Sequence, residues 1–157
     1  MGFKLDLAAA ATDQALHFNT TTKLAFAGYE VRATRIEDPA KGTMHWQDLS
    51  WDTTEPLTDI SGVEHPAGTT LHQQRSFFEN DVESRKNAAK DAAYAVIALT
   101  GKRPQPGFNF EKEQDDLMGK VVASVISYKP STKPGKEGFD NFRHTSTPQP
   151  AAAPAAE

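Results

Sequence analysis

The stretch KVVASVISYKPSTKPGKEGFDNFR, residues 120–143, decides the fold that we expect for this chain. It opens with a run rich in valine and isoleucine, passes through a turn of prolines, glycines and lysines, and ends in a segment that carries aromatic residues. β-Branched and aromatic residues favour strands, whereas proline and glycine favour the turn between them. The stretch therefore predicts a β-hairpin.

The predicted hairpin is basic, whereas the rest of the chain is acidic. Between Gly119 and His144 lie five basic and two acidic residues, a charge of +3. The formal net charge of the 157 residues is −4, so the remainder carries −7. A basic hairpin with aromatic residues on an acidic protein is suited to holding a polyanionic chain.

Length and composition are typical of one domain without covalent cross-links. The 157 residues suffice to bury a core, and the absence of cysteine excludes disulfides and thiolate metal sites. No run approaches the roughly 20 apolar residues that span a bilayer. The opening MGFKLDLAAAATDQ matches neither a signal peptide nor the myristoylation pattern. We therefore expect a soluble cytoplasmic protein that does not contact membranes.

The two ends of the chain are expected to lie outside the folded domain, which we place at residues 23–145. Residues 146–157 are rich in proline and alanine and contain one charged side chain, so they predict a disordered tail. Residues 1–22 are expected to form an arm, with apolar residues such as Phe18 to anchor it on the core.

The middle of the chain shows five strand patterns and one helix pattern. Residues 23–36 alternate in polarity, with Tyr29 and Val31 on one face. Helical spacing of small and apolar residues follows a capping pattern at Asn80 and stops at Gly101. The other strands are expected at 43–51, 69–78, 117–128 and 138–145, with a turn at 37–42, an acidic loop at 52–68 and a polar connector at 102–116.

Three strands, one helix and two more strands are the element order of the OB-fold, a five-stranded Greek-key barrel. The helix then closes one end of the barrel, a role that suits its narrow apolar face. The nucleic-acid face of an OB-fold lies on the second and third strands, between loops that correspond here to 37–42 and 129–138. The alternative is another α+β domain with a five-stranded antiparallel sheet.

The end of the chain resembles that of small bacteriophage single-stranded-DNA-binding proteins. The motif LMGKV at 117–121 follows an alanine-rich helix that ends in LTG at 99–101, and it leads to the lysine- and glycine-rich turn. The opening GFKLDL is also similar to that group, part of which is known only as a phage domain of unknown function. The resemblance covers roughly residues 2–145.

This resemblance implies an OB-fold and sequence-tolerant binding of single strands during phage replication or recombination, in the cytoplasm of the host cell. Members of the group also carry an acidic C-terminal tip that recruits partners. Here that tip is reduced to Glu157.

A bound single strand needs aromatic surface for its bases and positive charge for its phosphates. We therefore take as candidates the aromatic and basic residues of the predicted strands and of the closing hairpin. These nucleic-acid-binding candidates are Arg32, Arg35, Trp46, Trp51, Arg75, Phe77, Tyr128, Lys129, Lys133, Lys136, Phe139, Phe142 and Arg143.

Each candidate also has an ordinary structural explanation. Trp46 and Trp51 are five positions apart on one strand and point to opposite faces, so one is expected in the core and the other on the surface. The arginines are equally suited to ion pairs with Glu30 or Asp48. The lysines of the turn also serve to keep it solvated.

Catalysis is not expected, and no cofactor or metal is predicted. The five histidines are scattered, and the chain has neither a glycine-rich phosphate loop nor a nucleophile elbow. The sequence therefore predicts a non-catalytic protein that binds single-stranded DNA, self-associates or binds cooperatively, and contacts replication or recombination proteins. The alternative is a phage accessory or structural module whose aromatic residues form a protein interface.

Overall fold

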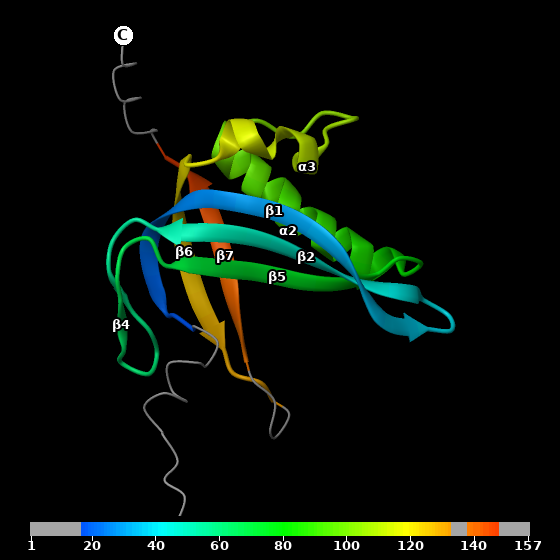
Figure 1. The fold of residues 1–157 in the computed structure, drawn as a ribbon, viewed down its shortest axis with the longest axis horizontal. Coiled ribbons are helices and arrows are strands. Elements are labelled where there is room, and N and C mark those ends of the chain that lie inside the picture. Colours follow the sequence, from blue (N-terminus) through cyan, green and yellow to red (C-terminus); the bar gives the residue numbers. More distant parts are fainter. Residues whose placement is uncertain (1–16, 133–137, 148–157) are drawn as a thin grey trace, which may run out of the picture.

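A computed structural model of the chain describes residues 17–132 and 138–147. In these residues a long helix, α2 (Val82–Thr100), crosses one face of a five-stranded antiparallel sheet with the order β5-β2-β1-β6-β7 (Figure 1). The predicted mainly β class and five-stranded antiparallel sheet are confirmed. The strands are β1 (Thr20–Asp38), β2 (Gly42–Thr53), β5 (Thr70–Phe78), β6 (Val121–Lys129) and β7 (Phe139–Ser146).

β1 is the central strand and joins two halves of the sheet. Its first residues pair with β6, and its residues from Leu24 onward pair with β2; within β1, Leu24 and Ala25 alone have partners on both sides. A register shift between Phe26 and Gly28 marks a β-bulge, where Gly28 adopts a φ of 156° that glycine tolerates. Beyond this bend, β1 and β2 continue as a hairpin that projects from the body (Figure 1).

The core lies between the inner face of the sheet and α2. Leu49 and Trp51 of β2 point to the same face of the sheet, and both are fully buried. Side chains alternate between the two faces of a strand, and the inward side chains of the other strands pack against Leu49 and Trp51. The buried cluster comprises Phe18, Leu24, Phe26, Leu49, Trp51, Leu57, Leu71, Ala95, Val96, Ala98, Leu99, Phe110, Leu117, Val122 and Ile126.

The predicted helix is present, with one correction at its start. Asp81, not Asn80, is the N-cap, because its carboxylate accepts a hydrogen bond from the Ser84 amide at 3.2 Å. A carboxylate there also complements the positive end of the helix dipole. At the other end Gly101 adopts the left-handed conformation, and its amide donates to the Ile97 carbonyl, as its position predicted.

The polar connector expected at 102–116 is partly helical, so the prediction of a single helix is wrong. It contains α3 (Phe110–Glu113) and a 3-10 turn, η1 (Gln114–Leu117). The Gln114 amide accepts from the Tyr29 N–H and donates to the Tyr29 carbonyl, both at 3.0 Å. The Phe110 ring stacks on Tyr29 with centroids 4.3 Å apart. These contacts hold the connector against the bend in β1, and the local polarity of the sequence gave no sign of them.

Two further boundaries differ from the prediction. The acidic loop contains a short hairpin of β3 (Leu57–Thr58) and β4 (Glu64–His65). The arm expected at 1–22 overlaps the domain, because β1 begins at Thr20 and Phe18 is fully buried in the core. The expected tail overlaps the end of β7, and its residues 148–157 lie outside the described segments.

The edge strands β5 and β7 are linked by side chains through His144. Its Nε2–H donates to Gln73 Oε1 at 2.7 Å, and its Nδ1 accepts from the Ser124 hydroxyl at 2.7 Å. The Trp51 indole N–H donates to the same Gln73 oxygen at 3.1 Å. Burial lowers the pKa of His144 to about 4. One neutral imidazole therefore connects β2, β5, β6 and β7.

Acid is expected to destabilise the protein through His144. As the pH falls below 6.5, His144 of the unfolded chain becomes protonated. In the folded protein the same imidazole stays neutral until the pH reaches about 4. Stability should therefore fall across this window, by about 3 kcal/mol at about 1.4 kcal/mol per pH unit. Urea unfolding at a series of pH values measures the loss.

The matched variant is His144→Gln, which hydrogen-bonds but does not titrate. Its stability should vary less with pH across the same window. An identical pH dependence in the two proteins would contradict this role for the imidazole.

Candidate nucleic-acid interface

The bend in β1 divides the outer surface of the sheet into two faces. Strand register shows which residues share each face, because directly paired residues point the same way. The acidic face, on β1, β2 and β5, contains Glu30, Arg32, Trp46, Asp48, Ser50, Asp52, Thr70, His72, Gln74 and Ser76. The basic face, on β1, β6 and β7, contains Thr21, Lys23, Ala123, Val125, Ser127, Lys129, Phe139, Asn141, Arg143 and Thr145.

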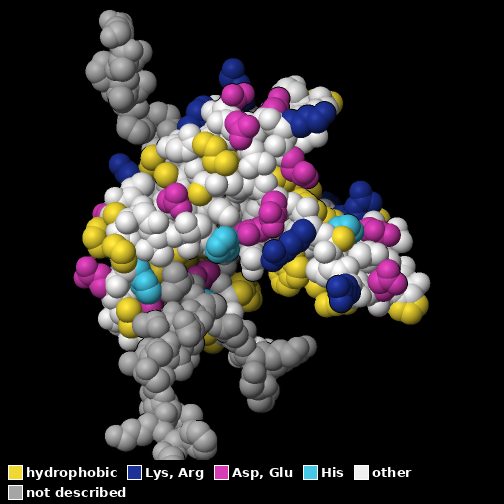
Figure 2. Space-filling model, in the orientation of Figure 1, with side chains coloured by type: hydrophobic (Ala, Val, Ile, Leu, Met, Phe, Trp, Pro, Cys, Tyr) yellow, Lys and Arg dark blue, Asp and Glu magenta, His cyan; other side chains and the backbone are white. Residues whose placement is uncertain are grey.

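The acidic face is where OB-fold order predicts the nucleic acid, yet its charge opposes a phosphate backbone. Three carboxylates lie there with one permanent cation, Arg32. That guanidinium lies 3.7 Å from Glu30 Oε1, and His72 Nδ1 lies 3.0 Å from Asp48 Oδ2. Figure 2 shows acidic, basic and histidine side chains interleaved on this side of the molecule. With three carboxylates and one permanent cation, this face keeps a net negative charge and does not attract an anion.

The two tryptophans divide as their spacing predicted. Trp51 is 0% exposed and packs edge-on against Phe26, with centroids 5.5 Å apart, so it is removed from the candidates for base stacking. Trp46 points to the acidic face, where it pairs in register with Arg32 and Ser76, and it is half-buried. Trp46 is therefore the tryptophan that a ligand can reach.

Arg75 and Phe77 point inward, to the side of the sheet that faces α2. The Arg75 Nε–H donates to Asp91 Oδ2 on α2 at 2.5 Å, so this arginine fastens the edge strand to the helix. The Phe77 ring stacks on His45 with centroids 5.2 Å apart and an interplanar angle of 10°. Both residues have structural partners away from the outer surface, a correction to their expected place on the DNA-binding face.

The basic face brings together three of the predicted residues, Lys129, Phe139 and Arg143. Lys129 pairs in register with Phe139, and Arg143 pairs with Val125. Phe139 is 61% exposed, the largest exposed fraction of any described aromatic side chain. No described residue forms an ion pair with either cation. The predicted hairpin thus presents an exposed aromatic ring and two cations that have no ion-pair partner among the described residues.

Sequence reasoning missed Lys23, which lies on the same face. β1 pairs Lys23 with Ala123, and Ala123 pairs with Thr145 of β7. Lys23 lies in a segment in which polar and apolar residues alternate, but only the pairing of β1 with β6 shows which residues lie next to it. The charged residues of this face are therefore all basic.

The one acid on β7, Asp140, points inward. Its carboxylate lies 3.3 Å from His17 Nδ1, and burial raises its pKa. Gly138 comes immediately before β7, at a place where a Cβ would collide with the Lys129 carbonyl oxygen, so glycine allows the close approach of the two chain segments there. Because side chains alternate along β7, Asp140 points to the inner face of the sheet and Arg143 points to the outer face.

The other candidates lie elsewhere. Tyr128 and Phe142 share the inward parity of Asp140 and are half-buried. Arg35 is exposed on the projecting hairpin, away from β6 and β7. Lys133 and Lys136 lie outside the described residues.

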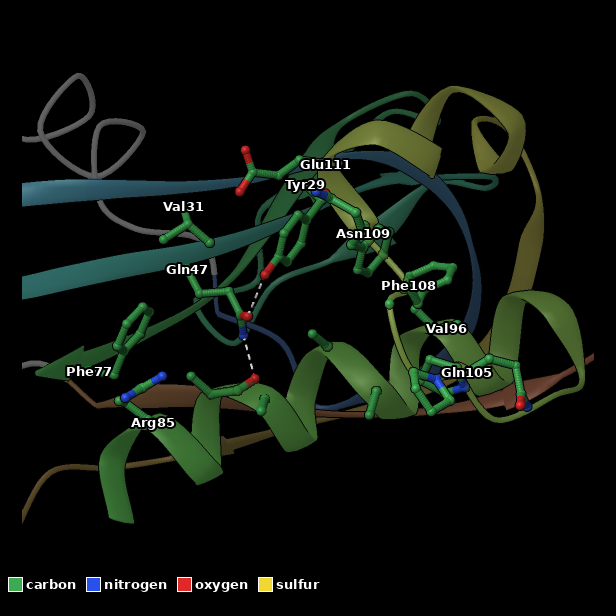
Figure 3. A pocket seen from close by; sticks show the side chains of 18 residues that line it. Tyr29, Val31, Gln47, Phe77, Arg85, Val96, Gln105, Phe108, Asn109 and Glu111 are labelled. Carbon is green, nitrogen blue, oxygen red and sulfur yellow. Dashed lines mark hydrogen bonds between the residues drawn. The ribbon is translucent and has the colours of Figure 1, made fainter. Parts of the chain in front are cut away.

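A groove of about 750 Å³ runs between the inner face of the β1–β2 hairpin and α2 (Figure 3). The Tyr29 hydroxyl donates to Gln47 Oε1 at 2.8 Å, and Gln47 Nε2 donates to the Ala88 carbonyl at 2.7 Å. Burial raises the pKa of Tyr29 to about 12. Phe77 and Phe108 stand on either side of this chain of hydrogen bonds (Figure 3). The groove is mostly apolar and offers no concentration of positive charge.

Other classes of site find no support in the described segments. Within 17–132 and 138–147, no three His, Asp or Glu side chains are grouped so as to hold a metal ion. None of the helices found there combines the length and apolar character that crossing a membrane requires. Comparison of the chain with family models, with curated proteins and with solved structures gives no match.

The tryptophan assignment predicts how solvent quenchers act on fluorescence. Acrylamide should quench the wild-type protein through Trp46, whereas Trp46→Phe, which keeps Trp51, should show little quenching until the protein unfolds. Stern–Volmer plots of both proteins measure this difference. Strong quenching of the folded variant would place Trp51 in contact with solvent and contradict the assignment.

Proposed function

We propose that this protein is a non-catalytic single-stranded-DNA-binding domain that holds the strand on its basic face. The observation that carries the proposal is that Lys23, Lys129 and Arg143 share one outer face with the exposed Phe139 ring, without a carboxylate among the outward residues that pair β6 with β1 and with β7. Such a face offers the two things that a single strand requires, positive charge for phosphates and a ring for bases.

The acidic net charge is compatible with this proposal because local charge governs contact with the DNA backbone. Charges on the solvent-exposed surface are screened beyond about 8 Å at physiological ionic strength. Of the three carboxylates of the acidic face, Glu30 and Asp48 lie beyond the bend in β1, whereas Asp52 lies opposite Ala25, where β1 meets β6. Asp52 therefore lies nearest to Lys23, and a phosphate at Arg143 or Lys129 lies further along the strands from these carboxylates.

The mode of binding that these residues favour is sequence-tolerant. Every base has a π-face that can stack on Phe139, and such stacking contributes about 1–3 kcal/mol per base. The neighbouring polar side chains, Ser127 and Asn141, both donate and accept hydrogen bonds and so suit more than one base. Specific readout would need a more restrictive set of partners.

The strand order supports an OB-type barrel as the fold of this domain. Arranged by position in the chain, the five long strands have the order third, second, first, fourth, fifth. Each neighbouring pair is antiparallel, so β5 and β7 run in the same direction, and both contact α2. Side chains span the remaining gap, as the Gln73–His144 hydrogen bond shows. A helix between the third and fourth strands is also the OB arrangement.

The same proposal includes the biological setting that the sequence resemblance implies. The protein acts in phage DNA replication or recombination in the host cytoplasm, and copies bind side by side along a strand. Protection of a strand requires many copies, and contacts with replication or recombination proteins follow from that setting.

Neutralising the basic face should weaken binding and reduce its dependence on salt. In the triple variant Lys23→Gln, Lys129→Gln, Arg143→Gln, the plot of log affinity for labelled oligo-dT against log salt should become shallower by about 2. That slope is about 0.7 per phosphate contact on a single strand. Fluorescence anisotropy at several salt concentrations measures it.

The charge-matched control is Lys102→Gln, Arg103→Gln, Lys112→Gln, three exposed cations at the end of α2 and in α3. This control should bind like wild type. Equal weakening in both triple variants would show that only net charge matters and would reject the basic face as the site.

The groove between α2 and the β1–β2 hairpin favours a second candidate function, a protein-interaction module. Its apolar lining and volume of about 750 Å³ suit a short peptide better than a nucleic acid. This candidate replaces the first if the folded wild-type protein leaves oligo-dT anisotropy unchanged at low salt.

A further inference from the structure

A second cavity lies beside the basic face, where β7 passes α2. It has a volume of about 390 Å³, within the range of about 300–1,000 Å³ typical of small-ligand sites. We call it the edge pocket. Arg143 borders it, so the pocket adjoins the proposed DNA-binding face. Its lining residues are Gln73, Asp91, Tyr94, Ile97, Asn141, Phe142, Arg143 and His144.

Tyr94 is the feature of this pocket that the fold does not explain. It is 60% exposed in the middle of α2, although the same helix buries Ala95, Val96 and Leu99 in the core. Phe142, on the facing strand, supplies a second ring to the pocket. Two aromatic side chains bordering one open cavity are suited to a flat, π-bonded ligand.

Two amide side chains in the pocket have hydrogen-bonding capacity to spare. Gln73 Oε1 accepts from Trp51 and His144, but no described group engages the Gln73 NH₂. The Asn141 side chain likewise has no described partner. A primary amide donates and accepts, so it matches the polar edge of any nucleobase.

A row of exposed cations continues from the pocket along α2. Lys86, Lys90 and Tyr94 are spaced four residues apart and therefore lie on one line of the helix surface. Both lysines are exposed, and neither forms an ion pair with a described residue. Positive charge is thus found on both sides of the pocket, at Arg143 and at Lys90.

We propose that the edge pocket receives one unstacked base of a single strand that leaves the basic face across β7. Tyr94 stacks on this base, the Asn141 and Gln73 amides contact its edge, and Lys90 and Lys86 contact the phosphates that follow. This inference rests on the proposed function, because it takes the same ligand and extends its path from the sheet onto α2.

The test is the affinity for oligo-dT of about 12 nucleotides, a length within the site sizes of single OB domains. Tyr94→Ala should weaken binding roughly five- to 100-fold, as expected for loss of one stacked base. Tyr94→Phe should retain binding, because it keeps the ring. Lys86→Gln with Lys90→Gln should make the salt slope shallower by about 1. Val82→Ala, at another exposed position of α2, is the matched control and should bind like wild type.

Photocrosslinking adds a readout that a merely structural role would not change. Oligo-dT in which 5-iododeoxyuridine replaces some thymidines reacts on irradiation with aromatic side chains that stack on it. Recovery of a crosslinked peptide that contains Tyr94 supports the inference.

The outcomes separate the two proposals. If wild type binds, the basic-face variant binds weakly, and Tyr94→Ala binds like wild type with crosslinks at Phe139 alone, the edge-pocket inference is overturned and the proposed function stands. If folded wild-type protein does not bind the oligonucleotide at low salt, both fall.

Discussion

The structure depends on one constraint, the pairing of β1 with different partners along its two halves. β6 takes the first half and β2 takes the second, and only Leu24 and Ala25 pair on both sides. A strand used in this way must bend, and the bulge before Gly28 provides the bend. The Gln114 amide and the Phe110 ring then brace the strand at Tyr29, where bulged backbone would otherwise lack partners.

The bend also creates the space that the other elements fill. The sheet curves so that β5 and β7 both reach α2, and the gap between them is bridged by buried polar groups instead of a backbone ladder. His144 is the centre of that bridge, and the Trp51 ring lies against it, with centroids 4.2 Å apart and an interplanar angle of 34°. A neutral imidazole satisfies a donor and an acceptor at once, which an apolar residue at this position would not do. The edge pocket lies beside the bridge, because Gln73 and His144 are among its lining residues.

The separation of charge on the outer surface of the sheet follows from the same pairing of β1 with two different partners. The three outward carboxylates lie on β1 and β2, in the half of the sheet that includes β5, and Arg32 and His72 lie next to two of them. Phe139, Lys129 and Arg143 lie on the half built by β6 and β7, and in the described part of the chain neither cation has an ion-pair partner. The polyanion site that we propose therefore lies on the first, fourth and fifth long strands and not on the second and third, although the order of elements alone favoured the latter.

The sequence by itself determined what depends on neighbours along the chain. Period-two alternation gave the faces of the strands, the left-handed glycine gave the end of α2, and the spacing of the tryptophans required one to be buried. Only the tertiary structure decided the features that depend on contacts between elements. These are the burial of Trp51, the ion pair of Arg75 with Asp91, and the position of Lys23 on the basic face. The local pattern of polar and apolar residues determines to which face of a strand a side chain points. Strand register and the docking of the helix determine which residues lie next to it. Register and docking depend on contacts between residues that are distant in the sequence. The same kind of contact places Tyr94 beside β7.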